Sequence, residues 1–216
     1  MCQISELYDL EHTQANAFLE RYTYPWQALE EIGALILKLG PTLVDYREVH
    51  PGVWIHPTAR VAESAQLDAP CIIGPDTEVR HCAFIRGNAL IGQGCVVGNS
   101  TELKNVILFD GVQVPHYNYV GDSILGYKAH LGAGAVCSNV RGDKGLVSIG
   151  GMPTGRKKVG AMIGDFAEIG CHAVLNPGTI IGRSSRVYPT ACVRGIVPAE
   201  HIYKNNGTIV KMEFDM

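Results

Sequence analysis

The stretch from Ile55 to Leu103, IHPTARVAESAQLDAPCIIGPDTEVRHCAFIRGNALIGQGCVVGNSTEL, places an aliphatic residue at every sixth position. These residues are Ile55, Val61, Leu67, Ile73, Val79, Ile85, Ile91, Val97 and Leu103. A period of six is neither the 3.6 of an α-helix nor the 2 of an ordinary half-buried strand. It is typical of hexapeptide repeats, which coil into a parallel β-helix with three hexapeptides in each circuit.

The same period returns further along the chain. It continues at Tyr119, Leu125 and Leu131, and then at Ile163, Ile169, Leu175, Ile181, Val187 and Val193. We therefore expect an all-β fold of about six to seven circuits. A small residue stands two positions before each aliphatic one, which predicts that Cys71 and Cys95 face inward as small core residues.

Composition excludes several classes of protein. The chain has 216 residues, 46% of them hydrophobic, and a net charge of −3, which is typical of a soluble globular protein of one or two domains. We find no basic stripe and no apolar run of about 20 residues, and the acidic first residues lack the pattern of a signal peptide, so we expect neither a nucleic-acid nor a membrane partner. Seven cysteines without a C-x-x-C pair argue against disulfides and a zinc ribbon, and favour a cytoplasmic location.

The first 50 residues differ from the repeats. YPWQALEE at residues 24–31 opens a helix that GP at residues 40–41 ends, and a shorter helix is expected over residues 13–21. We interpret residues 1–50 as a helical cap or arm that covers the open end of the coil; docking of a partner through Trp26 is the alternative. Residues 51–198 would form the β-helix, with an inserted loop at 139–158, and residues 199–216 a closing segment.

The period fails in two places. Tyr119 follows Phe109 by ten positions where the period asks for twelve, and a Gly-rich polar stretch separates Leu131 from Ile163. The second interruption predicts a projecting loop, and loops of this length are often functional.

Arg86 and Lys104 each follow an aliphatic position directly, and they are eighteen residues apart. The stacking of coils therefore places two cations on one face, about 4.8 Å apart along the axis. An anion such as a phosphate between them would turn repulsion into attraction. The alternatives are that both side chains point into solvent or pair with a neighbour such as Glu102.

His116 lies in PHYNYVGD at residues 115–122, close to the first interruption, where a histidine suits general-base chemistry or a structural role. The small residues of LGAGAVCSN at residues 131–139 either let the backbone approach a ligand or are simply one more coil.

These motifs carry a resemblance. IRGNALIG, GNSTELKN, PHYNYVGD and LGAGAVCSN, followed by AMIGDFAEIG, resemble the acetyltransferase domain of the bifunctional N-acetylglucosamine-1-phosphate uridyltransferase/glucosamine-1-phosphate acetyltransferase over about residues 53–195. The resemblance implies a left-handed β-helix, although the general rule for parallel crossovers predicts a right-handed one. It also implies acetyl-CoA as co-substrate and a homotrimer with the site at the seam between chains.

Residue by residue, the resemblance makes His116 the catalytic base. Substrate-binding residues would be Arg86, Lys104, Tyr119, His130 and Asn139, and cofactor-binding residues Ala133, Lys158 and Cys171. No metal ligand is implied. The sequence departs from the pattern at His130, Val140, Cys171 and Pro189, and its loop is longer.

Three functions follow as hypotheses. The first is an acetyl-CoA-dependent N-acetyltransferase acting on an amino-sugar 1-phosphate or a nucleotide amino sugar. No Gly-rich nucleotide-binding loop precedes the coil, so we expect no uridyltransferase activity from this sequence. The second is a non-catalytic sugar-nucleotide-binding or regulatory partner of a separate nucleotidyltransferase. The third is a β-helix metalloenzyme of the γ-carbonic-anhydrase kind, although among His81, His116 and His130 its close histidine pair is absent.

Overall fold

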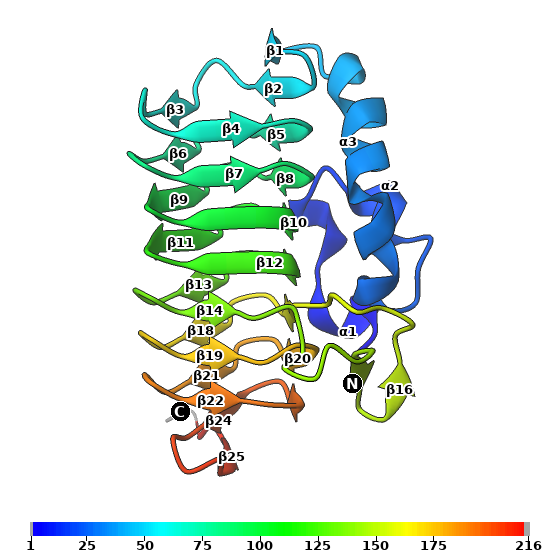
Figure 1. The fold of residues 1–216 in the computed structure, drawn as a ribbon, viewed down its shortest axis with the longest axis vertical. Helices are drawn as coiled ribbons and strands as arrows, with labels where there is room; N and C mark the ends of the chain where they lie inside the picture. Colours follow the sequence, from blue (N-terminus) through cyan, green and yellow to red (C-terminus); the bar gives the residue numbers. More distant parts are fainter. Residues whose placement is uncertain (1, 214–216) are drawn as a thin grey trace.

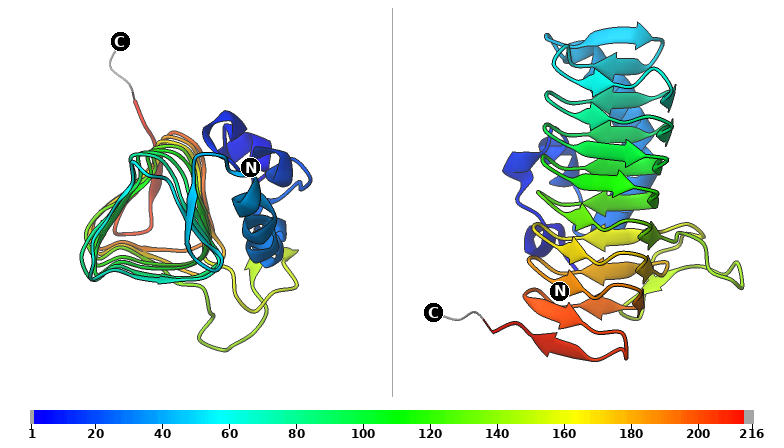
Figure 2. Two further views of the ribbon diagram at one scale, coloured as in Figure 1. Left: turned by 90° about the horizontal axis from the view of Figure 1, so that it is seen from above. Right: turned by 90° about the vertical axis from the view of Figure 1, so that its left-hand side faces the viewer.

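The computed structural model describes residues 2–213, and most of them wind into a left-handed parallel β-helix of triangular cross-section (Figures 1 and 2). Each circuit lays one short strand on each of three flat faces. The repeat predicted from the sequence, and the hand implied by the resemblance, are confirmed.

Face 1 stacks β2 (Val53–Ile55), β5 (Cys71–Ile73), β8 (Ala89–Ile91), the second half of β10 (Glu102–Leu108) and of β12 (Tyr119–Leu125), β17 (Ala161–Ile163), β20 (Thr179–Ile181) and β23 (Ile196–Val197). The antiparallel strand β1 (Arg47–His50) is added to β2.

Face 2 stacks β3 (Arg60–Val61), β6 (Glu78–Val79), β9 (Val96–Asn99), β11 (Gln113–His116), β13 (His130–Leu131), β18 (Glu168–Ile169), β21 (Arg186–Val187) and β24 (His201–Tyr203), and ends on the antiparallel β25 (Ile209–Lys211).

Face 3 stacks β4 (Gln66–Asp68), β7 (Phe84–Arg86), the first halves of β10 and β12, β14 (Val136–Cys137), β19 (Val174–Leu175) and β22 (Cys192–Val193).

The coil has about eight circuits rather than six to seven. The count from the sequence was low because Val114 was not recognised as a core residue and because the C-terminal segment adds Tyr203, which stacks on Val187. Cys71 and Cys95 are fully buried, as predicted.

The first interruption does not lie in the His116 motif, where the sequence analysis placed it. The buried core residues Leu108, Val114 and Val120 follow one another at the regular spacing of six. One residue is missing instead between Leu103 and Leu108, and another between Val120 and Leu125. At both places β10 and β12 run around the corner between faces 3 and 1 as continuous strands. Tyr119 is therefore not a core position; it precedes Val120 and faces outward.

The helical segment covers the outside of face 1 and does not close the end of the coil (Figures 1 and 2). Its elements are α1 (Ile4–Leu7), η1 (Leu10–His12), α2 (Asn16–Leu19), η2 (Pro25–Glu31), α3 (Ile32–Leu39) and η3 (Gly40–Thr42). Face 1 is apolar on both sides, since its outward residues include Ile72, Leu90 and Ile124, all buried. Strands buried on both sides need such a cover, and α3 packs against β5, β8 and β10.

The inserted segment between β14 and β17 contains a short hairpin of β15 (Ser148–Ile149) and β16 (Met152–Pro153). It is not a freely projecting loop, because Val147 and Ile149 are buried and Arg156 pairs with Glu30 of the helical segment, with Nη2 3.0 Å from Oε2. Within residues 2–213 no helix is long and apolar enough to cross a membrane.

Candidate active site

An outward-facing column of residues runs along the corner between faces 3 and 1, one residue from each coil. Strand register places Arg86 beside Asp68, and Lys104 beside Gly121. The same register extends the column through one residue in each of the following coils. We call this set the edge column; it consists of Arg86, Lys104, Gly121, Ser138, Asn176 and Arg194. The stacking of Arg86 and Lys104 that their spacing predicts is confirmed by the pairing of Ile85 with Leu103.

Both predicted phosphate ligands are paired with carboxylates. Arg86 Nη1 lies 2.6 Å from Glu102 Oε1, which is the neighbour that the sequence analysis named as an alternative partner. The Arg86 side chain is 43% exposed, so this pair can exchange for a ligand at little cost. Lys104 Nζ lies 3.5 Å from Asp122 Oδ2.

Asp122 is a buried carboxylate at the second shortened corner. It accepts hydrogen bonds from Asn105 Nδ2 at 2.9 Å and Asn139 Nδ2 at 2.5 Å, in addition to its contact with Lys104. Asn105 and Asp122 have φ values of 54° and 47°, and both hold the tightened turns of their coils. Burying a charge is costly unless it is paired and hydrogen-bonded, and this cluster supplies both kinds of partner.

Tyr119 and Asn139 lie over Gly121. A Cβ at position 121 would lie 2.6 Å from Tyr119 Oη and 2.8 Å from Asn139 Nδ2, so only glycine leaves room for them. Burial raises the pKa of Tyr119, and the charges of Glu102 and Asp122 act in the same direction. Four of the five predicted substrate residues, Arg86, Lys104, Tyr119 and Asn139, therefore share one surface.

The fifth, His130, lies on face 2, away from this cluster. Its neighbours across the strands are Gln113 and Glu168, and its Nδ1 lies 2.7 Å from Glu168 Oε2. Within one chain the structure does not bring His130 to Lys104 or Arg86.

A second column, the histidine column, follows the corner between faces 2 and 3. Register stacks His81, Asn99, His116, Ala133, Cys171 and Pro189. His116 is exposed, and its Nδ1 lies 3.1 Å from Asn99 Oδ1. A neutral imidazole that donates from Nδ1 keeps its free lone pair on Nε2, the form that a general base needs.

The turn after His116 is held by the buried side chain of Asn118. Its Oδ1 accepts from the His116 N–H at 3.1 Å, and its Nδ2 donates to the carbonyls of Gly132 and Ala135 at 2.8 and 3.2 Å. The position of His116 relative to Ala133 is thus fixed by hydrogen bonds between adjacent coils.

Ala133 and Cys171, both expected at the cofactor, have backbone N–H groups that donate to no other group among residues 2–213. The N–H groups around Ala133 are all used, since Gly134 donates to the His116 carbonyl at 2.9 Å and Gly132 to Ile169. Lys158, also expected at the cofactor, lies elsewhere. It bridges Val140 next to Asn139, at the base of the inserted loop.

The sequence analysis assigned no role to Asp122, although this residue is the last of the PHYNYVGD motif. Asn105 and Arg194 were missed as well, and only their place in the coil register could have shown them. Within the described range no group of three or more His, Cys, Asp or Glu side chains is arranged to hold a metal ion.

Comparison with known proteins agrees with this architecture. A family model described as "GMPPB C-terminal domain" matches residues 67–151. A bifunctional protein GlmU of Methanococcus maripaludis is 27% identical, over 96% of this chain and 53% of the relative. The chain resembles the GlmU-type bifunctional proteins. This confirms the resemblance found in the motifs.

A second relative is a bifunctional sugar-1-phosphate nucleotidylyltransferase/acetyltransferase of Sulfurisphaera tokodaii, 31% identical over 56% of this chain and 31% of the relative. The chain spans about half the length of the GlmU relative and about a third of this one. Among solved structures, the acetyltransferase domain of PglB from Neisseria gonorrhoeae in complex with acetyl coenzyme A covers 74% of this chain and 58% of its own, with 19% identity and a TM-score of 0.37.

Proposed function

We propose that the protein is an acetyl-CoA-dependent N-acetyltransferase that acts on an amino-sugar 1-phosphate or a nucleotide amino sugar. The observation that carries the proposal is the histidine column, in which His116, with Nε2 free, stacks directly on the open N–H group of Ala133. The motif resemblance and the names of the relatives in both comparisons support the same chemistry.

The reaction is transfer of an acetyl group from the thioester to an amine. His116 Nε2 accepts the proton of the attacking amine, and the Ala133 N–H stabilises the negative charge that develops on the thioester oxygen. The Cys171 N–H, one coil further along, is open to a carbonyl of the pantetheine chain. Because the cofactor brings an activated acyl group, the protein has mainly to position the reactants and remove a proton.

The substrate would be held by the cluster on face 3. Arg86 and Lys104 offer two cations to a phosphate, with Glu102 and Asp122 as their partners when no phosphate is present. Tyr119 and Asn139, which lie together over Gly121, offer hydrogen-bonding groups to the sugar.

The test is a measurement of thiol release from acetyl-CoA with a panel of amino-sugar 1-phosphates and nucleotide amino sugars. His116→Ala should lower kcat by about 10²–10⁴-fold with the best acceptor, the usual contribution of a general base. His81→Ala is the matched control, because His81 lies in the same column two coils away and is exposed.

Turnover of His116→Ala equal to that of His81→Ala would overturn the assignment of the base. Binding of a sugar nucleotide without any binding of acetyl-CoA would instead favour the non-catalytic alternative, a partner of a separate nucleotidyltransferase.

We also propose that three chains pack side by side. The edge column and the histidine column lie on opposite sides of face 3, so a seam between neighbouring chains would bring the histidine column of one chain toward the cations of another. Sedimentation equilibrium should give three times the mass of one chain, and a monomer that retains full turnover would contradict this arrangement.

A further inference from the structure

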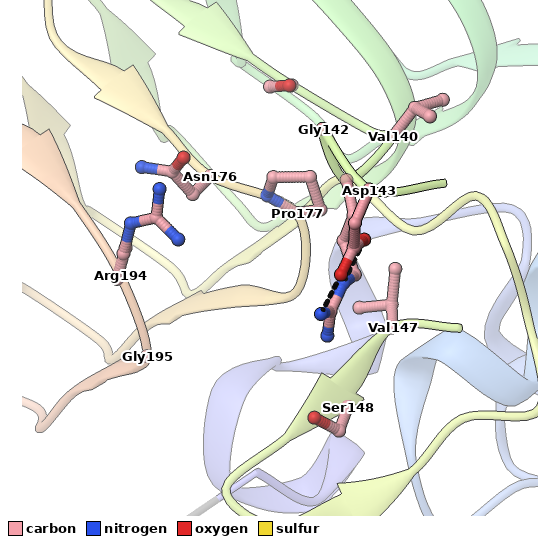
Figure 3. Close-up of a pocket in the computed structure, with 11 residues that line it drawn as sticks. Val140, Gly142, Asp143, Val147, Ser148, Asn176, Pro177, Arg194 and Gly195 are labelled. Atoms are coloured by element: carbon pink, nitrogen blue, oxygen red, sulfur yellow. Dashed lines mark hydrogen bonds and ion pairs between the residues drawn. The ribbon is translucent and has the colours of Figure 1, made fainter. Parts of the chain in front are cut away.

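The inserted loop and face 3 enclose a polar pocket of about 590 Å³ that no step of the proposed reaction uses. One wall belongs to the β-helix and carries Ser138, Asn176 and Arg194, the last members of the edge column. The other wall is the loop, which contributes Asp143 and Ser148 (Figure 3). A pocket of this size is large enough for a nucleotide.

The loop wall is fixed in place. Val147 and Ile149 are buried against Gly178, where a Cβ would come within 2.7 Å of Val147 Cγ1 and 3.0 Å of Ile149 Cγ1. The contact of Arg156 with Glu30 joins the far end of the loop to η2. The pocket therefore has two rigid walls and is not the space under a mobile flap.

The charge left over in the pocket is positive. Asp143 is neutralised by Arg141, with Nη2–Oδ2 at 2.6 Å and Nε–Oδ1 at 2.9 Å, and these bonds hold the pKa of Asp143 well below its usual range. Arg194 is exposed and has no hydrogen bond or ion pair with any residue in the range 2–213. The pocket thus presents one uncompensated guanidinium.

The groups beside Arg194 are hydrogen-bonding groups. The hydroxyls of Ser138 and Ser148 make no hydrogen bond within the described part of the chain. Asn176 Nδ2 donates to the Val193 carbonyl at 2.8 Å, which leaves Asn176 Oδ1 free to accept. The Arg194 and Asn176 side chains lie together on the β-helix wall, across the pocket from Asp143 (Figure 3). A planar guanidinium with nearby hydroxyl donors is the usual protein environment for phosphate oxygens.

We propose that this pocket binds the phosphate groups of a nucleotide, with Arg194 as the cationic contact. Arg194 is four coils beyond Lys104 on the edge column, roughly 19 Å at the spacing of stacked strands. An extended molecule with one end near Lys104 can therefore place a nucleotide in the pocket. Two molecules of the proposed reaction carry a nucleotide, the sugar nucleotide and coenzyme A, and this choice of ligands rests on the proposed function.

The experiment measures equilibrium binding of two probes by titration calorimetry: UDP, and 3′-phospho-ADP, which is the nucleotide end of coenzyme A. Arg194→Gln should weaken binding of one of them at least about tenfold, and the probe that is affected identifies the source of the nucleotide. Arg186→Gln is the matched control, because Arg186 is also exposed and without an ion pair among residues 2–213, but lies on face 2.

Ser148→Trp is a second variant that fills the pocket from the exposed hairpin and leaves the β-helix untouched; it should weaken the same probe. Equal affinity of Arg194→Gln and Arg186→Gln for both probes, or no binding of either probe by the unmodified protein, would overturn the proposal. This experiment measures binding and not acetyl transfer. The pocket proposal can therefore be overturned without affecting the assignment of His116 as the base, which the turnover of His116→Ala tests separately.

Discussion

Two single residues that are missing from the repeat create the polar cluster beneath the candidate substrate site. The shortened corners turn Asn105 and Asp122 toward each other, and Asn139 closes the cluster from the next coil, so that one buried carboxylate receives three donors. In a regular coil, each of these two corners would have one more backbone residue. The carboxylate holds Asn139, which lies beside Tyr119 over Gly121, and it draws Lys104 toward the same corner.

Replacing the carboxylate tests this role. Asp122→Ala removes the carboxylate that accepts from Asn105 and Asn139 and pairs with Lys104, and we expect it to lower the free energy of unfolding by about 1–3 kcal/mol. The measurement is the urea midpoint at an unchanged m-value. Asp143→Ala, which removes an exposed carboxylate from the loop, should leave the midpoint unchanged. A similar decrease in the free energy of unfolding in both variants would show that the buried cluster contributes no more to stability than an exposed carboxylate does.

At the scale of elements, the inserted segment is a second layer docked on the coil. Its hairpin packs over Gly178, and its far end is paired with η2, so it connects face 3, face 1 and the helical segment. The absence of a side chain at position 178 is what allows this contact. The wall of the pocket therefore depends on one glycine of the coil.

Gly178→Ala should release the hairpin. Gly178 and Gly195 have φ values of +78° and +81°, so alanine at either position costs about 1–2 kcal/mol of backbone strain. At Gly178 the new Cβ would also collide with Val147 and Ile149, whereas at Gly195 nothing lies within 4 Å. Trypsin should cut at Arg141 or Lys144 much faster in Gly178→Ala than in Gly195→Ala. Equal cleavage rates would show that the hairpin is not held by this contact.

For the whole molecule, the helical segment and the coil are joined through a buried carboxylate. Asp165 Oδ2 accepts from the Asp9 N–H at 2.8 Å and pairs with Arg183 at 3.0 Å, and its Oδ1 accepts from the Tyr127 N–H at 2.8 Å. Burial raises the pKa of Asp165 above its usual 3.8, and these hydrogen bonds and Arg183 oppose the rise only in part. The folded protein therefore holds this proton more tightly than the unfolded chain does.

The stability of the protein should depend on pH accordingly. As the pH rises from 3.8 through the raised pKa, the unfolded chain has already lost the proton, so ionisation of the folded state costs stability. The measurement is urea unfolding of the unmodified protein and of Asp165→Asn from about pH 4 to about pH 8. The unmodified protein should lose stability relative to Asp165→Asn until the pH passes the raised pKa of Asp165, and the difference should stay constant at higher pH. A difference that grows with pH in the opposite direction would contradict the raised pKa.

The sequence predicted the coil well because every core residue of a hexapeptide must be small or aliphatic. It misplaced Tyr119 because Tyr119 and Val120 are both apolar, and only the facing of the side chains distinguishes them. It located the stack of Arg86 on Lys104, which depends on register alone. It could not place Arg194 in a pocket, because the pocket forms only when the loop docks on Gly178. It also could not place the helices, because their apolar residues indicate which side is buried but not which face of the coil that side packs against.

The inserted segment begins and ends at the same point of the coil. The Val159 N–H donates to the Asn139 carbonyl at 3.0 Å, and Val140 bridges Lys158, while Cys137 still stacks between Val120 and Leu175. The strand register of the coil on either side therefore does not depend on the length or composition of the inserted segment. A loop from another protein could be grafted there without refolding the coil. Exchange of this loop could therefore change which ligand is bound, while His116 and the histidine column stay as they are.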